Sequence, residues 1–313
     1  MTSDTGTTAR RAPARAGRVG VSGGRAGAGR AGRAGGRRAA GGRGLTGAVL
    51  PLLVFAAVAF GVPFVAMVNG SFTSGGHYTL GNFTASLQGP ALTALLGSVK
   101  LSALAALIAA VAGLLLAQAV VSSRFAALRH VTLTASGVLA NFGGVPLAFA
   151  FVATLGNAGV VTTHLGLASL GWSLYSFWGL LLTYLYFLVP LMVLTIVPAL
   201  DGLRTQWREA ALNNGATTGQ YWRHVALPVL MPSLLGGYVL LFGSAFAAYA
   251  TAAAMVTAAV PLTTLQIAKA LDGNVIVGQT NIALAMSVDM VVVAAVVMAV
   301  YLPLQRRTAR WLA

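Results

Sequence analysis

Six long apolar runs constrain the fold of this sequence more than any other feature. They cover approximately residues 45–68, 92–121, 131–154, 174–200, 229–259 and 281–303. Because a helix rises about 1.5 Å per residue, about 20 apolar residues cross a bilayer core about 30 Å thick. Charged residues make up 8% of the chain, whereas a soluble domain carries about 25%. The sequence therefore predicts an all-α, polytopic membrane protein with six transmembrane helices.

The first 44 residues differ in composition from everything that follows. They contain ten arginines and a single acidic residue, Asp4, with almost no large apolar side chains. Such a segment buries too little surface to offset the entropy of folding. We therefore expect a disordered Arg/Gly-rich cytoplasmic tail over residues 1–44 and a transmembrane domain over 45–313. Because the tail lacks aromatic residues for base stacking, it favours anionic membrane lipid over specific nucleic acid.

Basic residues predict the orientation, because Lys and Arg accumulate in cytoplasmic loops. If the six helices alternate in direction, 18 of the 20 basic residues fall on one side of the membrane, and only Lys100 and Lys269 do not. We therefore expect both termini in the cytoplasm. The external loops would then lie near residues 69–91, 155–173 and 260–280.

The longest internal hydrophilic stretch, residues 201–228, falls on the predicted cytoplasmic side. Apolar residues are spaced there as on two short helices, one around Trp207 and the other around Trp222. Gly215 lies between them and permits the positive φ of a sharp turn, and Pro228 suits the start of the next membrane helix. The pattern predicts a compact two-helix elbow beside the membrane, with an ordinary interfacial helix-turn-helix as the simpler interpretation.

The elbow resembles a signature of the permease family of binding-protein-dependent ATP-binding-cassette (ABC) importers. That signature reads Glu-Ala-Ala, three residues, Gly, nine residues, Ile, one residue and Leu-Pro. The matching residues are Glu209, Ala210, Ala211, Gly215, Val225, Leu227 and Pro228. Only Val225 departs from it, and the replacement is conservative.

The resemblance implies a type I (MetI-like) permease fold in a bacterial inner membrane, with the elbow docking on a separate ATPase subunit. It also implies a second permease subunit, identical or homologous, and an extracytoplasmic solute-binding protein. A second stretch, starting at Ala140, resembles the third helix of polyamine, iron(III) or thiosulfate-type permeases. There Asn141, Gly143, Gly144 and Pro146 would break the helix, either beside a water-filled path or as a packing kink.

Two ionisable residues lie inside predicted membrane helices, Lys100 and Asp289. Charges in such positions are costly, so they are candidates for the solute path. The two residues lie at similar distances from the outer helix ends, so they could also pair as a structural clamp. Polar candidates for the path are Ser244, Tyr249, Thr251, Tyr184 and Tyr186.

The sequence shows no catalytic or metal-binding pattern. It has no cysteine, and its four histidines, at 77, 130, 164 and 224, have no paired spacing. No phosphate-binding loop with a Gly-rich Lys-Ser/Thr pattern is present, so ATP hydrolysis is expected in another chain. We therefore expect a transport permease without cofactor, metal or enzymatic activity. An ATP-independent channel or secondary carrier is the alternative, and an intramembrane enzyme a third class.

Overall fold

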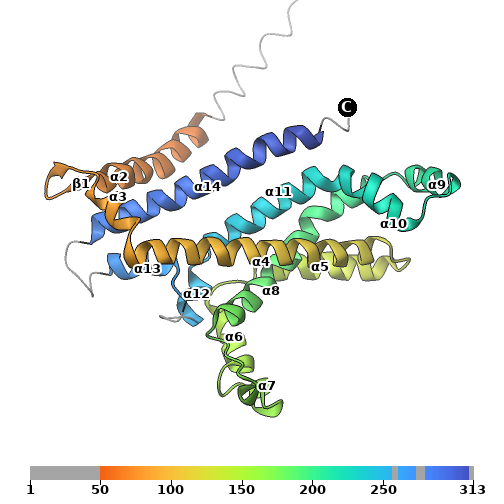
Figure 1. Cartoon of the computed structure of the whole chain (residues 1–313), viewed down its shortest axis with the longest axis horizontal. Helices are drawn as coiled ribbons and strands as arrows, with labels where there is room; N and C mark the ends of the chain where they lie inside the picture. The colour runs from red at the N-terminus through yellow and green to blue at the C-terminus, as the bar shows by residue number, and fades with distance from the viewer. Residues whose placement is uncertain (1–49, 256–259, 273–278, 310–313) are drawn as a thin grey trace, which may run out of the picture. The chain divides into compact units, whose positions relative to one another are not determined.

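The computed structural model describes residues 50–255, 260–272 and 279–309 (Figure 1). The chain divides into two units, residues 1–56 and 57–313, and the packing reported below is that of the second. The expected tail over residues 1–44 lies outside the described residues.

Within the described residues, six helices are long and apolar enough to cross a membrane, which confirms the all-α, six-helix prediction. These spans are Leu50–Ser71, Gly89–Val121, Val145–His164, Phe177–Asp201, Thr218–Phe246 and Thr280–Arg307. Several of them combine shorter elements, because prolines, glycines and wide turns interrupt the regular α-helical hydrogen bonds.

The individual elements follow one another along the chain with short connections. They are η1 Ala57–Gly61, α2 Val62–Ser71, β1 Thr73–Ser74, β2 His77–Tyr78, α3 Gly81–Ser86, α4 Gly89–Val121, α5 Ala126–Asn141, α6 Val145–Leu155, α7 Val160–His164, η2 Leu167–Leu170, α8 Phe177–Asp201, α9 Thr205–Asn213, α10 Thr218–Tyr221, η3 Trp222–Ala226, α11 Leu227–Phe246, α12 Ala250–Met255, α13 Thr263–Leu271 and α14 Thr280–Ala309. The two strands pair antiparallel as a hairpin.

Two of the expected helix boundaries were wrong. The run 131–154 is two helices, α5 and α6, because the backbone turns at Gly144, whose φ is +77°. Pro146 then occupies the first turn of α6, where its missing N–H costs nothing. The run 229–259 ends as α11 at Phe246, and the short helix α12 follows it.

Helix α8 occupies the centre of the packing and lies against α4, α5 and α11. Small side chains let these helices approach closely, which matters because lipid supplies no hydrophobic drive between membrane helices. Met192 of α8 is fully buried between two glycines of its neighbours. A Cβ atom at Gly113 of α4 would lie 2.5 Å from the Met192 Cβ, and one at Gly237 of α11 would lie 2.8 Å from its sulfur.

The two helix breaks meet, and polar side chains satisfy their freed backbone groups. Thr251 of α12 is buried; its hydroxyl accepts from the Gly144 N–H at 2.9 Å and lies 3.3 Å from the Gly144 carbonyl. Tyr184 of α8 is buried, and its hydroxyl donates to the Ala248 carbonyl at 3.0 Å. These bonds stabilise irregular backbone that would otherwise be unfavourable at membrane depth.

We expect Gly113→Ala to lower the free energy of unfolding by about 1–3 kcal/mol, because the added methyl overlaps Met192. Thermal unfolding of the purified chain in detergent measures the effect. Gly137→Ala on α5 is the matched control, since nothing lies within 4 Å of the position that its added methyl would take. Equal stability of the two variants would contradict the close α4–α8 packing.

We expect Tyr184→Phe to cost about 1–3 kcal/mol, because it removes a buried hydroxyl and leaves the half-buried Ala248 carbonyl without its donor. The control is Tyr186→Phe, which removes a hydroxyl that makes no hydrogen bond to any described residue and keeps the ring contact with Phe151. The control should change stability by less than about 0.5 kcal/mol in the same unfolding experiment. A Tyr184→Phe variant as stable as this control would argue against the role of the hydroxyl.

Candidate functional site

The predicted elbow is present, and its turn is a Schellman motif at the end of α9. The Ala216 N–H donates to the Ala211 carbonyl at 3.0 Å, and the Gly215 N–H donates to the Leu212 carbonyl at 2.9 Å. Gly215 has a φ of +81°, in the left-handed region that glycine adopts without a Cβ clash. The turn thus satisfies the last carbonyls of α9 and sends the chain sharply back.

The second arm of the elbow begins with a capping box. The Thr217 hydroxyl accepts from the Gln220 N–H at 3.3 Å, and the Gln220 side chain accepts from the Thr217 N–H at 2.7 Å. Each side chain satisfies a backbone donor that a helix N-terminus leaves free. The start of α10 is therefore specified by its own sequence.

This second arm is not a separate short helix, contrary to the sequence-based expectation. Helix α10 passes through the wide turn η3 directly into α11, so that Thr218–Phe246 forms one continuous span. Pro228 explains the wide turn, because it lacks an N–H and its ring would clash with the carbonyl four residues earlier. The elbow is therefore joined to a membrane helix without a flexible loop.

The signature residues lie on both arms and differ in exposure. Glu209 and Ala210 are exposed on α9, Ala211 is half-buried, and Val225 and Leu227 are half-buried on the second arm. Pro228 is exposed in the first turn of α11. Helix α9 has no buried residue at all. It therefore presents its surface outward.

Two apolar side chains of α9 add to this exposed surface, since Trp207 and Leu212 are 36% and 43% exposed. The Arg204 guanidinium lies 5.8 Å from the centre of the Trp207 ring, which is within cation–π range. An exposed helix that combines large apolar groups with charges is typical of a protein-binding surface.

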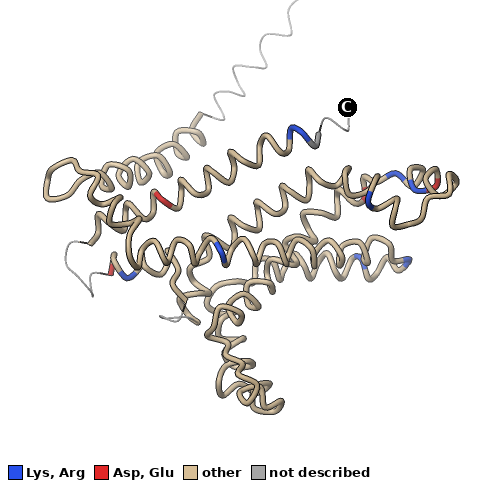
Figure 2. Tube along the Cα trace, viewed as in Figure 1, with Lys and Arg blue, Asp and Glu red and all other residues tan. Residues whose placement is uncertain are grey.

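All seven arginines of the described residues gather at the end of the bundle that carries the elbow. Figure 2 shows basic residues on the α9 elbow, around the start of α5 and near the end of α14, all at one end. Arg129 of α5 forms an ion pair with Asp201 at the end of α8. Sequence patterns did not predict this pair, because its members lie 72 residues apart. It ties α5 to the point where the elbow begins.

Lys100 and Asp289, for which the sequence left a pairing open, do not pair. Asp289 on α14 instead accepts a hydrogen bond from the Ser86 hydroxyl of α3 at 2.6 Å. Lys100 is exposed on α4 and forms no ion pair with a described residue. The packing explains the difference, because α14 lies against α2, α3, α11 and α13, whereas α4 lies mainly against α8 and α11.

The polar candidates for a solute path divide into buried and accessible groups. Tyr184 and Thr251 are buried and hold the helix breaks, so their hydroxyls are already engaged. Tyr249, at the break between α11 and α12, is 45% exposed. Ser244 is half-buried and lines a pocket of about 450 Å³ between α11 and α14. Tyr186 is half-buried against Phe151.

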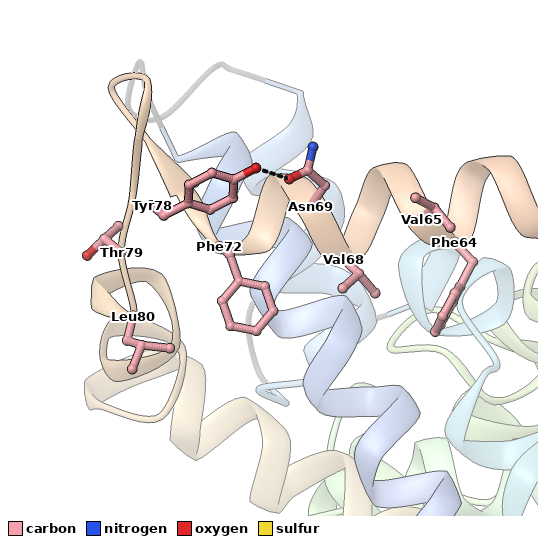
Figure 3. A pocket seen from close by; sticks show the side chains of 8 residues that line it. All are labelled: Phe64, Val65, Val68, Asn69, Phe72, Tyr78, Thr79 and Leu80. Atoms are coloured by element: carbon pink, nitrogen blue, oxygen red, sulfur yellow. Dashed lines mark hydrogen bonds between the residues drawn. The ribbon is translucent and has the colours of Figure 1, made fainter.

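Another pocket, of about 720 Å³, lies at the end of α2 beside the β-hairpin (Figure 3). Its lining contains Phe64, Phe72 and Leu80 but no charged residue. One hydrogen bond, from the Tyr78 hydroxyl to the Asn69 side-chain oxygen at 3.3 Å, crosses its polar end. It has none of the grouped titratable side chains that catalysis requires. Over the described residues, no group of three metal-ligating side chains occurs either.

Solved structures share this architecture. A bacterial ABC transporter involved in the import of the acidic polysaccharide alginate matches 84% of this chain and 95% of its own, with a TM-score of 0.71 and 18% identity. The MetNI methionine ABC transporter, in inward-facing conformations, matches 71% of this chain and 99% of its own, with a TM-score of 0.51 and 15% identity. At these identities the likeness establishes the fold.

Curated relatives match over a short region. The spermidine/putrescine transport system permease protein PotC of Escherichia coli strain K12 is 36% identical over 66 residues, which are 21% of this chain and 25% of that protein. The sulfate transport system permease protein CysT of Salmonella typhimurium is 37% identical over 68 residues, which are 22% and 24% of the two proteins. The matched segments thus span about a quarter of the length of these relatives.

The family is decided by a longer match. The model of the binding-protein-dependent transport system inner membrane component matches residues 109–310, which is more than half of the chain and includes the whole elbow. Together with the six-helix fold, this match shows that the chain belongs to the family of binding-protein-dependent transport system inner membrane components.

Proposed function

We propose that this chain is the permease subunit of a bacterial ABC importer and receives force from a separate ATPase subunit through its elbow. The observation that carries the proposal is the geometry of the signature residues. Glu209 and Ala210 lie exposed on a helix that buries none of its residues, and the adjoining arm continues without a loop into α11. An isolated channel or carrier has no need of such a surface.

The elbow is suited to transmit motion because both of its ends are fixed. One end follows α8, which Arg129 ties to α5, and the other is continuous with α11. A push on α9 would therefore move whole helices rather than deform a loop. Closure of two ATPase subunits against such levers would rotate helix bundles and switch access between the two sides of the membrane.

The proposed orientation places the elbow and both termini in the cytoplasm. The support is the gathering of the seven described arginines at the elbow end of the bundle, as the positive-inside rule expects. The β-hairpin, α7 and α13 would then face the outside. There they would meet an extracytoplasmic solute-binding protein.

We propose that Lys100, Tyr249 and Ser244 line the solute path. Thr251 and Asp289 instead have structural roles, because their side chains bond to other helices. Lys100 is exposed on an apolar helix with Leu96 and Leu107 exposed on the same side. A charge so placed is unfavourable against lipid, so this side of α4 would face a second permease subunit or the water-filled path. The relatives named above transport polyamines or sulfate, which carry opposite charges, so they do not determine the solute.

Gly215→Val should uncouple the elbow from the ATPase subunit. Valine in the left-handed region of Gly215 costs about 1–2 kcal/mol. The measurement is the amount of ATPase subunit that copurifies with the affinity-tagged chain from native membranes. We expect this amount to fall by about fivefold or more. Gly215→Asn should retain most of the recovery, because asparagine tolerates this backbone conformation.

Gly219→Ala, on the adjacent α10, is the control for a substitution within the same elbow and should leave recovery unchanged. Membrane insertion of every variant is checked by fractionation. If no ATPase subunit copurifies even with the unaltered chain, or if Gly215→Val recovers it normally, the proposed coupling is wrong.

Single cysteines test the orientation, and the chain offers a clean background because it contains none. Leu170 in η2 and Leu212 in α9 are both exposed, at 79% and 43%. A membrane-impermeant maleimide should label Leu170→Cys in intact spheroplasts but label Leu212→Cys only after permeabilisation. Labelling of Leu212→Cys from the outside would reverse the orientation and rule out an ATPase contact at the elbow.

A further inference from the structure

A third pocket lies beside the elbow, and none of the signature residues lines it. Its volume is about 360 Å³, within the usual range for small-ligand pockets. Its walls come from the end of α4, the end of α8, helix α9 and the start of the second arm. The pocket therefore lies where both arms of the elbow meet the bundle.

The charge of this pocket is positive. Arg204 and Arg208 line it, and no Asp or Glu does. Asp201, which directly follows the lining residue Leu200, is engaged by Arg129. Glu209 belongs to the same helix as Arg208 but does not line the pocket. The two guanidinium groups thus have no acidic partner within it.

The rest of the lining mixes neutral polar residues, Gln118, Ser122, Thr205, Thr218 and Tyr221, with the apolar residues Val121, Leu200, Leu203 and Trp222. Tyr221 is only 6% exposed, and among the described residues its hydroxyl makes no hydrogen bond. The Gln118 side chain at the end of α4 likewise makes no hydrogen bond to any described residue. Thr205 and Thr218 add hydroxyls.

We propose that this pocket binds a phosphate-bearing anion. Arginine forks bind tetrahedral oxyanions through paired N–H donors. A phosphate oxygen would also accept from the Tyr221 hydroxyl and the Gln118 amide, neither of which bonds to a described residue. The phosphate belongs either to a soluble anion of the cytoplasm or to the headgroup of an anionic lipid in the adjacent leaflet.

Binding at this place would restrain the elbow. An occupant held by Gln118 of α4, Arg208 of α9 and Tyr221 of the second arm would tie both arms of the elbow to α4. Occupancy would thereby oppose movement of α9. This consequence for transport rests on the proposed function, whereas the binding site itself does not.

The test begins with the full-length chain purified in maltoside micelles, which contain no phosphate. Inorganic phosphate is titrated by calorimetry at constant ionic strength with chloride as the balancing anion. We expect saturable binding, weakened about tenfold or more by the double substitution Arg204→Gln and Arg208→Gln. Tyr221→Phe, which removes one hydroxyl, should weaken it about fivefold.

Arg223→Gln is the matched control, because it removes an arginine of the same elbow that does not line the pocket. Its affinity should stay within about twofold of the unaltered chain, since an exposed charge contributes little at that site. Amide hydrogen exchange locates the ligand independently. Phosphate should slow exchange over residues 203–223.

A second experiment adds phosphatidylglycerol to the micelles in place of phosphate. A rise in thermal stability that the Arg204/Arg208 double variant loses would assign the site to a lipid headgroup, and an effect of phosphate alone would assign it to a soluble anion. The proposal is overturned if neither ligand binds saturably, or if Arg223→Gln weakens binding as much as the double variant.

The proposal is also overturned if an added ATPase subunit abolishes phosphate binding, because the pocket would then belong to the protein interface. The titration itself uses no ATPase subunit. Failure of anion binding therefore leaves the proposed coupling function standing, and failure of coupling leaves the anion site standing.

Discussion

In a hydrocarbon environment every backbone N–H and C=O requires a partner within the protein, and this requirement shapes the bundle. Regular helices satisfy it by themselves. Among the described residues, the helix breaks after α5 and after α11 lie within the bundle and receive side chains from other helices. Thr251 and Tyr184 supply them by bonding to Gly144 and Ala248. The breaks are therefore part of the packed core.

Close helix packing follows from the same environment. Because lipid is as apolar as a leucine side chain, helices associate through van der Waals contact, and small residues permit the closest approach. Met192 packs between Gly113 and Gly237, so α4 closely approaches the backbone of α8, and α11 packs against the Met192 side chain. This rigid centre is joined to the elbow, because α8 leads into one end of it and α11 continues from the other.

The elbow combines local and tertiary features. Its turn and its second N-terminus are specified locally by Gly215, Thr217 and Gln220. The Arg129–Asp201 pair and the pocket beside Tyr221 depend on helices distant in sequence. The same structure thus offers an outward surface on α9, suited to a protein partner, and an inward basic pocket, suited to an anion.

The sequence by itself determined the number of membrane helices, the position of the elbow and its positive-φ glycine. These depend on hydrophobic run length and on residue spacing within about twenty positions, which a single chain displays directly. Only the tertiary structure decided the partner of Asp289, the roles of Thr251 and Tyr184, and the basic pocket. The physical reason is that each joins residues from separate helices, and helix packing depends on side-chain shape across the bundle, which periodicity does not encode.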